Sequence, residues 1–292
     1  MVRRAVPFVL LALLSACSVI RLSYDNADWV LARLAASYVE LDRSQAAALK
    51  VRLGEFHAWH RRQELPRYAH LFDEAAMRLE RGVTRDDVVW AVGAARNRLR
   101  VLGWEAAQDL APLLMTLNET QLAGLQRRFS EDNEKFANEK LPTDPEKAIR
   151  ARSHWLCERL EDWTGRLTPA QREHATGLVR AFPEMPALRL QDRVRRQAEL
   201  LRLLREGDPG GALQARLAVF LANPEAGRSD RYRRTLAEWE ERFIDMLVEL
   251  DRSLTPIQRA TAVERLRSYA GQFRLLTAQG ADKRLARDRA NM

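Results

Sequence analysis

The pattern of apolar and polar positions predicts α-helix over nearly the whole chain after residue 25. Apolar residues recur at spacings of three and four, and no segment alternates apolar with polar residues over a length rich in β-branched side chains. Pro and Gly are sparse and stand where helices would begin or end. We therefore expect an all-α protein, an elongated bundle of about ten helices joined by short capped corners.

The expected helix boundaries follow from capping residues, prolines and glycines. We place helices at about 26–39, 42–65, 66–81, 84–117, 118–140, 144–167, 168–182, 186–206, 208–223, 229–250 and 255–280. Pro66 should break or kink the second helix, because proline lacks a donor and disfavours helical geometry at the preceding residue. Gly103 and Pro112 are weaker break points, and the first helix should turn Trp29, Leu34 and Val39 inward.

A short motif occurs four times, each time between two predicted helices. A helix that contains Trp ends in Leu, a capping residue follows, and Gln stands three residues after the cap. In such a capping box the cap oxygen accepts a hydrogen bond from the new helix, and the Gln side chain accepts one from the N–H of the cap. The motif predicts four helix corners, whose role in function or in structure alone is left open. The pairs are Asp42 and Gln45, Asn118 and Gln121, Thr168 and Gln171, and Thr255 and Gln258.

The first 16 residues have the form of a signal peptide. Arg3 and Arg4 precede an apolar run that is too short to span a bilayer, which needs about 20 apolar residues. The run ends in Leu14-Ser15-Ala16-Cys17, which resembles the bacterial lipobox. The resemblance implies cleavage between Ala16 and Cys17, attachment of diacylglycerol to Cys17 and acylation of its amine.

This N-terminus divides the chain into parts with different expected roles. Residues 1–16 are removed, 17–25 form a short tether, and 26–280 form one helical domain, with a subdivision near 141–145 left open. The charged tail 281–292 is expected to fray. Ser18 follows Cys17 where Asp is the usual inner-membrane retention signal, so the resemblance implies the periplasmic face of the outer membrane.

Charge and cysteine content narrow the partners. The formal net charge is +8, but an exported protein meets lipid and glycan rather than nucleic acid. We expect anchoring to the membrane, with envelope proteins, anionic lipid or glycan as further partners and no nucleic acid. Acylation of Cys17 would leave Cys157 without a disulfide partner, and its apolar neighbours favour a buried, inert thiol.

The segment 59–68 is the most distinctive stretch within the predicted helices. His57, His60 and Glu64 share a helix face there, but a metal would need a further converging ligand, and Arg61 and Arg62 beside the set disfavour a cation. A solvated or ion-paired face is the simpler interpretation. The candidate interaction residues in this segment are Trp59, His60, Arg61, Arg62, Glu64 and Tyr68.

A second candidate surface is basic. Arg189, Arg193 and Arg196 follow helical spacing, with leucines toward another face. They form either the solvated side of an ordinary amphipathic helix or a contact for phosphorylated lipid or glycan.

The sequence contains no recognisable catalytic signature. It lacks Gly-x-Ser-x-Gly, Cys-x-x-Cys, His-Glu-x-x-His and a glycine-rich phosphate loop. The acidic pairs at 86–87 and 240–241 consist of adjacent helical residues, which point apart. We expect no enzymatic activity, no cofactor and no metal site, and a metal-dependent enzyme is the third interpretation.

Two resemblances bear on function. Leu167–Gln171 and Leu254–Gln258 read Leu-Thr-x-x-Gln, which is similar to the motif of the Spy and CpxP type of periplasmic chaperones. Those proteins are α-helical and cradle unfolded clients, so a chaperone-like module is the alternative function. The lipobox and segments 24–29, 59–68 and 158–168 together resemble a Gram-negative lipoprotein family of unknown function. That family implies an outer-membrane lipoprotein and supplies no catalytic residue. The leading expectation is a non-enzymatic, lipid-anchored scaffold or binding protein of the cell envelope.

Overall fold

The computed structural model describes residues 24–141, 144–207 and 212–290, with side chains described as far as Gly280. Within these ranges the protein has ten helices and no strand, which confirms the all-α prediction. None of these helices combines the length and the apolar character that crossing a membrane requires. The helices are α2 (Ala27–Ala36), α3 (Arg43–Glu80), α4 (Arg85–Leu114), α5 (Glu119–Lys140), α6 (Pro145–Thr164), α7 (Pro169–Arg180), α8 (Pro186–Glu206), α9 (Leu213–Ala222), α10 (Asp230–Ser253) and α11 (Pro256–Ala290).

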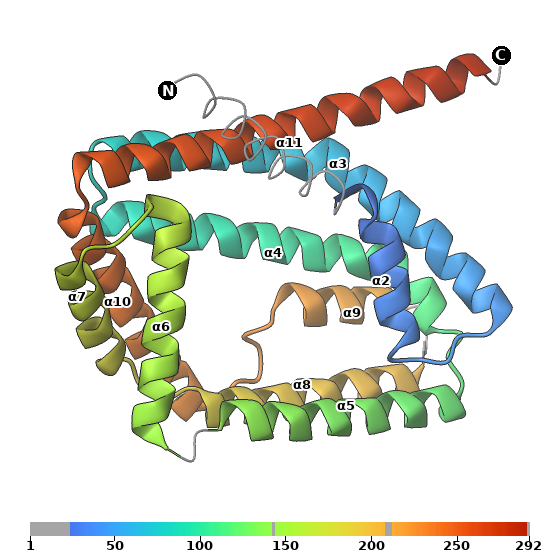
Figure 1. Ribbon diagram of the computed structural model, residues 1–292. Coiled ribbons are helices and arrows are strands. Elements are labelled where there is room, and N and C mark those ends of the chain that lie inside the picture. Colours follow the sequence, from blue (N-terminus) through green and yellow to red (C-terminus); the bar gives the residue numbers. More distant parts are fainter. Residues whose placement is uncertain (1–23, 142–143, 208–211, 291–292) are drawn as a thin grey trace, which may run out of the picture.

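The helices are arranged as an extended frame (Figure 1). α3 and α11 pack together along one side, and α5 and α8 along the opposite side. α6, α7 and α10 close one end, α2 stands at the other, and α4 packs on α9 in the interior. The buried apolar residues accordingly form several clusters rather than one, with separate groups at α6, α7 and α10, at α4 and α9, and at α5 and α8.

α3 continues without interruption through Pro66, so the predicted break and the separate helix after it are wrong. Pro66 and Arg62 lie on the exposed face, whereas Leu65 and Ala69 are buried. The carbonyl that loses its donor is therefore on the solvent side, where water can bond to it. Packing of the opposite face, mainly against α11, holds the helix together.

α4 is also continuous, through both Gly103 and Pro112. Gly103 serves close packing rather than a break, because a Cβ atom there would lie 2.6 Å from the carbonyl oxygen of Leu221. The absence of a side chain at this position lets α9 approach α4 closely.

Two further boundaries differ from the prediction. α11 extends to Ala290, because the expected frayed segment contains good helix formers such as Ala, Leu and Arg and no Gly or Pro. α9 begins at Leu213, and the expected cap at 208–209 lies outside the described residues.

In α2, Trp29 and Leu34 point outward, not inward, with 62% and 53% of their surfaces exposed. Val39 lies beyond the end of α2, half-buried against the α5 and α8 cluster.

The four capping motifs form capping boxes, and the boxes associate in two pairs. In the first pair, Gln45 Nε2 donates to Gln121 Oε1 (3.3 Å) and Gln121 Nε2 donates to Gln45 Oε1 (2.6 Å). In the second pair, Gln171 and Gln258 make the same reciprocal bonds at 2.8 and 3.0 Å. Corners that are 76 and 87 residues apart are thereby joined side by side.

Each glutamine in these pairs uses its whole side-chain amide. The oxygen also accepts the backbone N–H of its own cap, and the nitrogen also donates to a backbone carbonyl of the opposite corner. Those carbonyls belong to Thr116, Glu40, Ser253 and Arg166. All four glutamines are buried, so each lost bond would leave a buried polar group without a partner.

Replacing one member of a glutamine pair should destabilise the fold. We expect Gln45→Ala to lower the free energy of unfolding by about 1–3 kcal/mol, because Gln121 and a backbone carbonyl lose their partners inside the protein. Urea unfolding of Gln45→Ala, Gln121→Ala and the double variant measures the loss and the coupling between the two residues. The exposed Gln191→Ala is the control, with an expected change below about 0.5 kcal/mol. Additive losses from the two single variants would contradict the pairing.

Candidate functional site

One face of segment 59–68 is buried in contacts with other parts of the protein, while Arg62 and Pro66 lie on its exposed face. Glu64 is fully buried, and Arg67 and Arg98 contact its carboxylate at 2.8 and 3.3 Å. Arg61 is also buried, where it binds the Asp25 carboxylate at 2.6 Å and donates to the carbonyl of Leu276. These contacts join α3 to α4, to α11 and to the residues before α2, so the interpretation as a solvated or ion-paired face holds through the ion pairs of Glu64 and Arg61.

The aromatic residues of the segment pack in the same region. His60 hydrogen-bonds to the hydroxyl of Tyr24 at 2.9 Å, and Trp59 packs on Phe56. Burial lowers the pKa of His60, although Glu64 acts in the opposite direction, and burial raises the pKa of Tyr68 to about 12. A neutral imidazole and a protonated phenol suit a packed interior.

The remaining expectations for segment 59–68 concern exposure and metal binding. Arg62 is exposed on α3. Among the described residues there is no group of three or more His, Cys, Asp or Glu side chains placed to hold a metal ion.

Cys157 is buried, and burial raises the pKa of its thiol. Ala16 and Cys17 lie outside the described residues.

The three arginines of the basic surface bind their neighbours within the protein. The Arg193 side chain donates to Asn133 at 2.8 Å, and Arg196 donates to the carbonyl of Phe220 and covers its ring at 4.3 Å. Arg189 lies 5.8 Å from the centre of the Trp239 ring. Arg193 and Arg196 thus join α8 to α5 and to the end of α9. Burial lowers the pKa of Arg196, as expected for a guanidinium that is removed from water.

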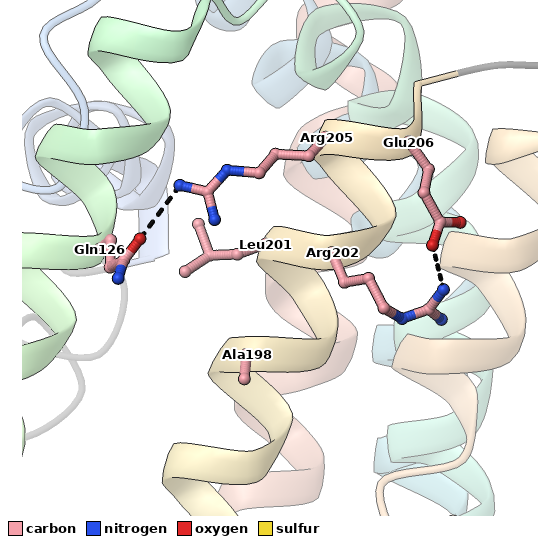
Figure 2. Close-up of a pocket in the computed structure, with 6 residues that line it drawn as sticks. All are labelled: Gln126, Ala198, Leu201, Arg202, Arg205 and Glu206. Atoms are coloured by element: carbon pink, nitrogen blue, oxygen red, sulfur yellow. Dashed lines mark hydrogen bonds and ion pairs between the residues drawn. The ribbon is translucent and has the colours of Figure 1, made fainter.

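A shallow hollow between α5 and α8 is lined by charged side chains that already have partners (Figure 2). Arg205 donates to Gln126 and Glu119, and Arg202 binds Glu206 and Glu199. An anionic ligand would have to displace these carboxylates, so this hollow is a poor binding site.

The strongest candidate site is an apolar pocket at the end of the frame formed by α6 and α10. Its volume is about 590 Å³, and it lies between α4, α6 and α10, with parts of its wall from α3 and α11. Three tryptophans line it, Trp90 from α4 and Trp155 and Trp163 from α6. Trp155 is 61% exposed, so this pocket residue also presents apolar surface to solvent.

The floor of this tryptophan pocket is the apolar cluster of α6 and α10. Phe243, Met246 and Leu250 from α10 line it together with Leu156 and Leu160 from α6. The pocket size falls within the range of about 300–1,000 Å³ that is typical of small-molecule sites. Its walls therefore offer a concave apolar surface rather than a set of catalytic groups.

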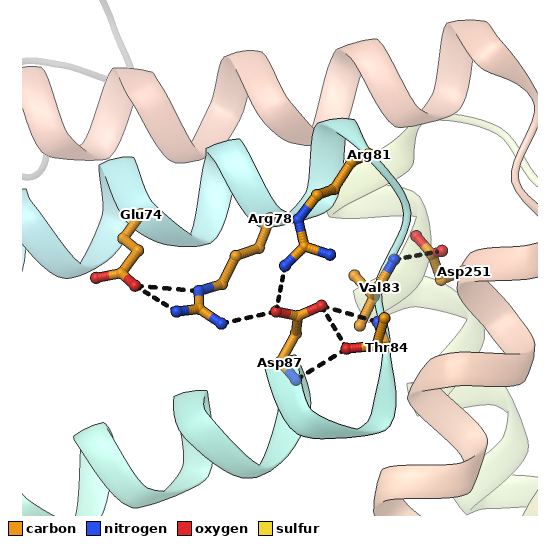
Figure 3. Close-up of polar contacts among 7 residues, drawn as sticks. All are labelled: Glu74, Arg78, Arg81, Val83, Thr84, Asp87 and Asp251. Carbon is orange, nitrogen blue, oxygen red and sulfur yellow. Dashed lines mark hydrogen bonds and ion pairs between the residues drawn. The ribbon is translucent and has the colours of Figure 1, made fainter.

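Charged residues at the edge of the pocket form two separate sets of hydrogen bonds, one around Asp87 and one at Asp251 (Figure 3). Asp87 accepts bonds from the backbone and hydroxyl of Thr84 and from Arg78 and Arg81. The guanidinium of Arg78 also covers Trp90 at 4.2 Å. Asp251 accepts from the backbone N–H of Val83 at 2.9 Å and thereby ties α10 to the loop before α4.

The balance of these contacts keeps Asp87 ionised. Burial acts to raise its pKa, but the hydrogen bonds from Thr84, Arg78 and Arg81 outweigh burial and hold the pKa well below its usual range. The sequence identified Asp87 only as one of two adjacent acidic residues, because the arginines that contact it come from the end of α3.

The pocket itself was missed by the sequence interpretation. Trp155 and Trp163 are eight residues apart and so lie near one face of a helix, which was the available signal. Nothing in the sequence indicated that this face would lie opposite Trp90.

The Asp87 network should make stability depend on acid. We expect Asp87→Asn to lower the free energy of unfolding by about 1–3 kcal/mol at neutral pH, since two arginines lose a charged acceptor. The pKa of Asp87 is depressed in the folded protein. The difference in free energy of unfolding between the unchanged protein and Asp87→Asn is therefore complete above pH about 4, and it is lost as pH falls further. Urea unfolding at several pH values measures it, with the exposed neighbour Asp86→Asn as control. A difference that stays constant as pH falls would contradict this account.

Comparison with known proteins identifies the family of the chain. Residues 37–233 match the Family of unknown function (DUF6279), over about two thirds of the chain, from before α3 to the first residues of α10. The match includes segments 59–68 and 158–168, so the expectation of a family of unknown function is confirmed. Comparisons with curated proteins and with solved structures found no match. The chain therefore belongs to DUF6279, a protein family of unknown function.

Proposed function

We propose that this protein is a lipid-anchored, non-enzymatic binding protein at the periplasmic face of the outer membrane, and that its tryptophan pocket holds an acyl chain. The observation that carries the proposal is the pocket of about 590 Å³ lined by Trp90, Trp155 and Trp163. Indole rings bury large apolar areas, and Trp155 offers exposed apolar surface to an entering ligand.

The polar groups of the pocket favour an acyl chain over a peptide. Asp87 and Asp251 already accept several hydrogen bonds each, and the Thr164 hydroxyl donates to the carbonyl of Leu160. A bound peptide would leave its backbone N–H and C=O groups without partners in this pocket, which costs free energy. A hydrocarbon chain needs no such partners.

The proposed location is supported by the N-terminal sequence. The lipobox-like ending at Cys17 supports lipid anchoring, and Ser18 after it supports the outer membrane. The proposal of a non-enzymatic role rests on the absence of catalytic signatures from the sequence. An envelope protein that binds acyl chains would meet them on lipids and on other lipoproteins.

A chaperone-like role is the second candidate. The same pocket and the exposed Trp155 favour it, since an unfolded client presents apolar side chains. The Leu-Thr-x-x-Gln corners do not add to this candidate, because their glutamines are buried in the paired corners.

Filling the pocket should abolish acyl-chain binding. Ala91 lines the pocket from an exposed position on α4, so Ala91→Phe adds a ring to the cavity without removing a core contact. We expect affinity for a fatty acid brominated at mid-chain to fall at least about tenfold, measured by quenching of tryptophan fluorescence in the chain from Ser18 onward.

Ala151→Phe on α6 is the matched control, because residue 151 is exposed and is not part of the pocket wall. Equal quenching of both variants would remove the pocket from the proposal. Suppression of client aggregation at near-stoichiometric ratio, without fatty-acid binding, would favour the chaperone-like role instead.

Lipid attachment can be tested separately from binding. In a Gram-negative host, we expect mass spectrometry of the membrane-extracted protein to find an N-terminal peptide that begins at Cys17 and carries diacylglycerol and an amide-linked acyl chain. Cys17→Ser should retain the uncleaved signal peptide, while Ser15→Thr, which keeps a small hydroxyl residue, should still be processed. An unmodified Cys17 would exclude lipid anchoring.

A further inference from the structure

The short helix α2 has its large apolar residues on the outside. Trp29, Val30, Leu31 and Leu34 are exposed over 62%, 51%, 41% and 53% of their surfaces. None of its residues is fully buried. A surface helix of a globular protein ordinarily turns such residues toward the core and charged residues toward water.

The inner face of α2 is made of small residues and is well packed. Ala32 and Ala35 lie against a cluster that contains Leu49 and Leu53 of α3 and Leu113 of α4. Their short side chains bring α2 close to α3, so the helix is seated firmly with its large residues outward. The inverted pattern is therefore a feature of the packed fold.

The start of α2 is also held in place. Tyr24 hydrogen-bonds to His60, and Asp25 pairs with the buried Arg61 at 2.6 Å. These contacts fix the orientation of α2, and of its exposed apolar face, relative to the rest of the protein.

The proposed anchor places this face near lipid at all times. Tyr24 follows Cys17 by seven residues, so the two lie at most about 25 Å apart whatever path the chain takes between them. The tether is shorter than the thickness of a bilayer, and α2 is the helix nearest to Cys17 in the sequence among the described residues.

The residues of the face suit the headgroup region of a membrane. Tryptophan concentrates at membrane interfaces, where its ring is partly apolar and its N–H remains hydrated. Arg33 lies beside Trp29, with its guanidinium 5.9 Å from the ring, and a long cationic side chain can reach lipid phosphate while its stem stays in apolar surroundings. An amphipathic helix of this kind lies in the plane of the interface.

We infer that the outer face of α2, formed by Trp29, Val30, Leu31 and Leu34, lies in the headgroup layer of the leaflet that holds the lipid on Cys17. The inference rests on the proposed lipid anchor and adds an orientation to it. In the frame, α2 stands at one end, whereas α6 and α10, which form the tryptophan pocket, stand at the other (Figure 1). The pocket consequently lies at the end of the frame opposite the inferred membrane contact.

The test measures the depth of α2 in a membrane. The mature lipoprotein is reconstituted in vesicles of phosphatidylethanolamine and phosphatidylglycerol, with an NBD fluorophore on Leu34→Cys. The matched control is Ile257→Cys, which is 80% exposed at the start of α11, at the end of the frame away from α2. Cys157 is buried, and labelling of the unchanged chain measures its background. We expect headgroup spin-labelled lipid to quench the fluorophore at position 34 at least about threefold more than at position 257, because only position 34 lies within the interface.

The outcomes separate this inference from the proposed anchor. Equal quenching at both positions, with diacylglycerol found on Cys17 by mass spectrometry, overturns the membrane contact of α2 and leaves the anchor intact. Protection of position 34 from iodide without quenching by spin-labelled lipid also overturns it, in favour of a protein partner. If Cys17 carries no lipid, the anchor fails, and the same quenching with added vesicles then decides whether α2 binds a membrane by itself.

Discussion

The fold depends on two buried pairs of glutamines that join helix corners distant in the sequence. In each pair, both amides accept the N–H of their own cap, donate to the carbonyl of the opposite corner and bond to each other. A corner whose backbone N–H and C=O groups are hydrogen-bonded in this way can be buried against another corner. An ordinary helix end cannot be buried, because its free N–H and C=O groups are bonded to water. The pairs therefore join the helices at two corners of the frame. The buried apolar residues between these corners form several small clusters.

This construction explains where the apolar pocket lies. The Gln171 and Gln258 pair joins the starts of α7 and α11, beside the ends of α6 and α10 that contribute to the pocket. Arg259 and Asp251 reinforce the same region, and Asp251 ties it to the loop before α4. Hydrogen bonds and ion pairs hold the helices apart at this end of the frame. The apolar side chains between these helices can therefore line a pocket rather than fill the space completely.

Buried charged residues are also satisfied by partners from elsewhere in the chain. Several charged residues that would suit a surface, including Glu64, Arg61 and Asp87, are buried and paired with residues of other helices. Arginine is well suited to this role because its planar guanidinium donates to several acceptors at once and remains charged. Arg61 is the one buried arginine among the described residues, whereas Arg62 beside it remains exposed.

The sequence by itself determined the helical class and the four capping boxes, because periodicity, caps and prolines act within a few residues of each other. It misjudged Pro66 and α2, since the outcome there depends on which face of a helix another helix covers. Only the tertiary structure decided that the glutamines pair, that Glu64 and Arg61 are internal, and that Trp90 lies in one pocket with Trp155 and Trp163. Those relations join residues from separate helices, and local pattern carries no information about which helices will meet.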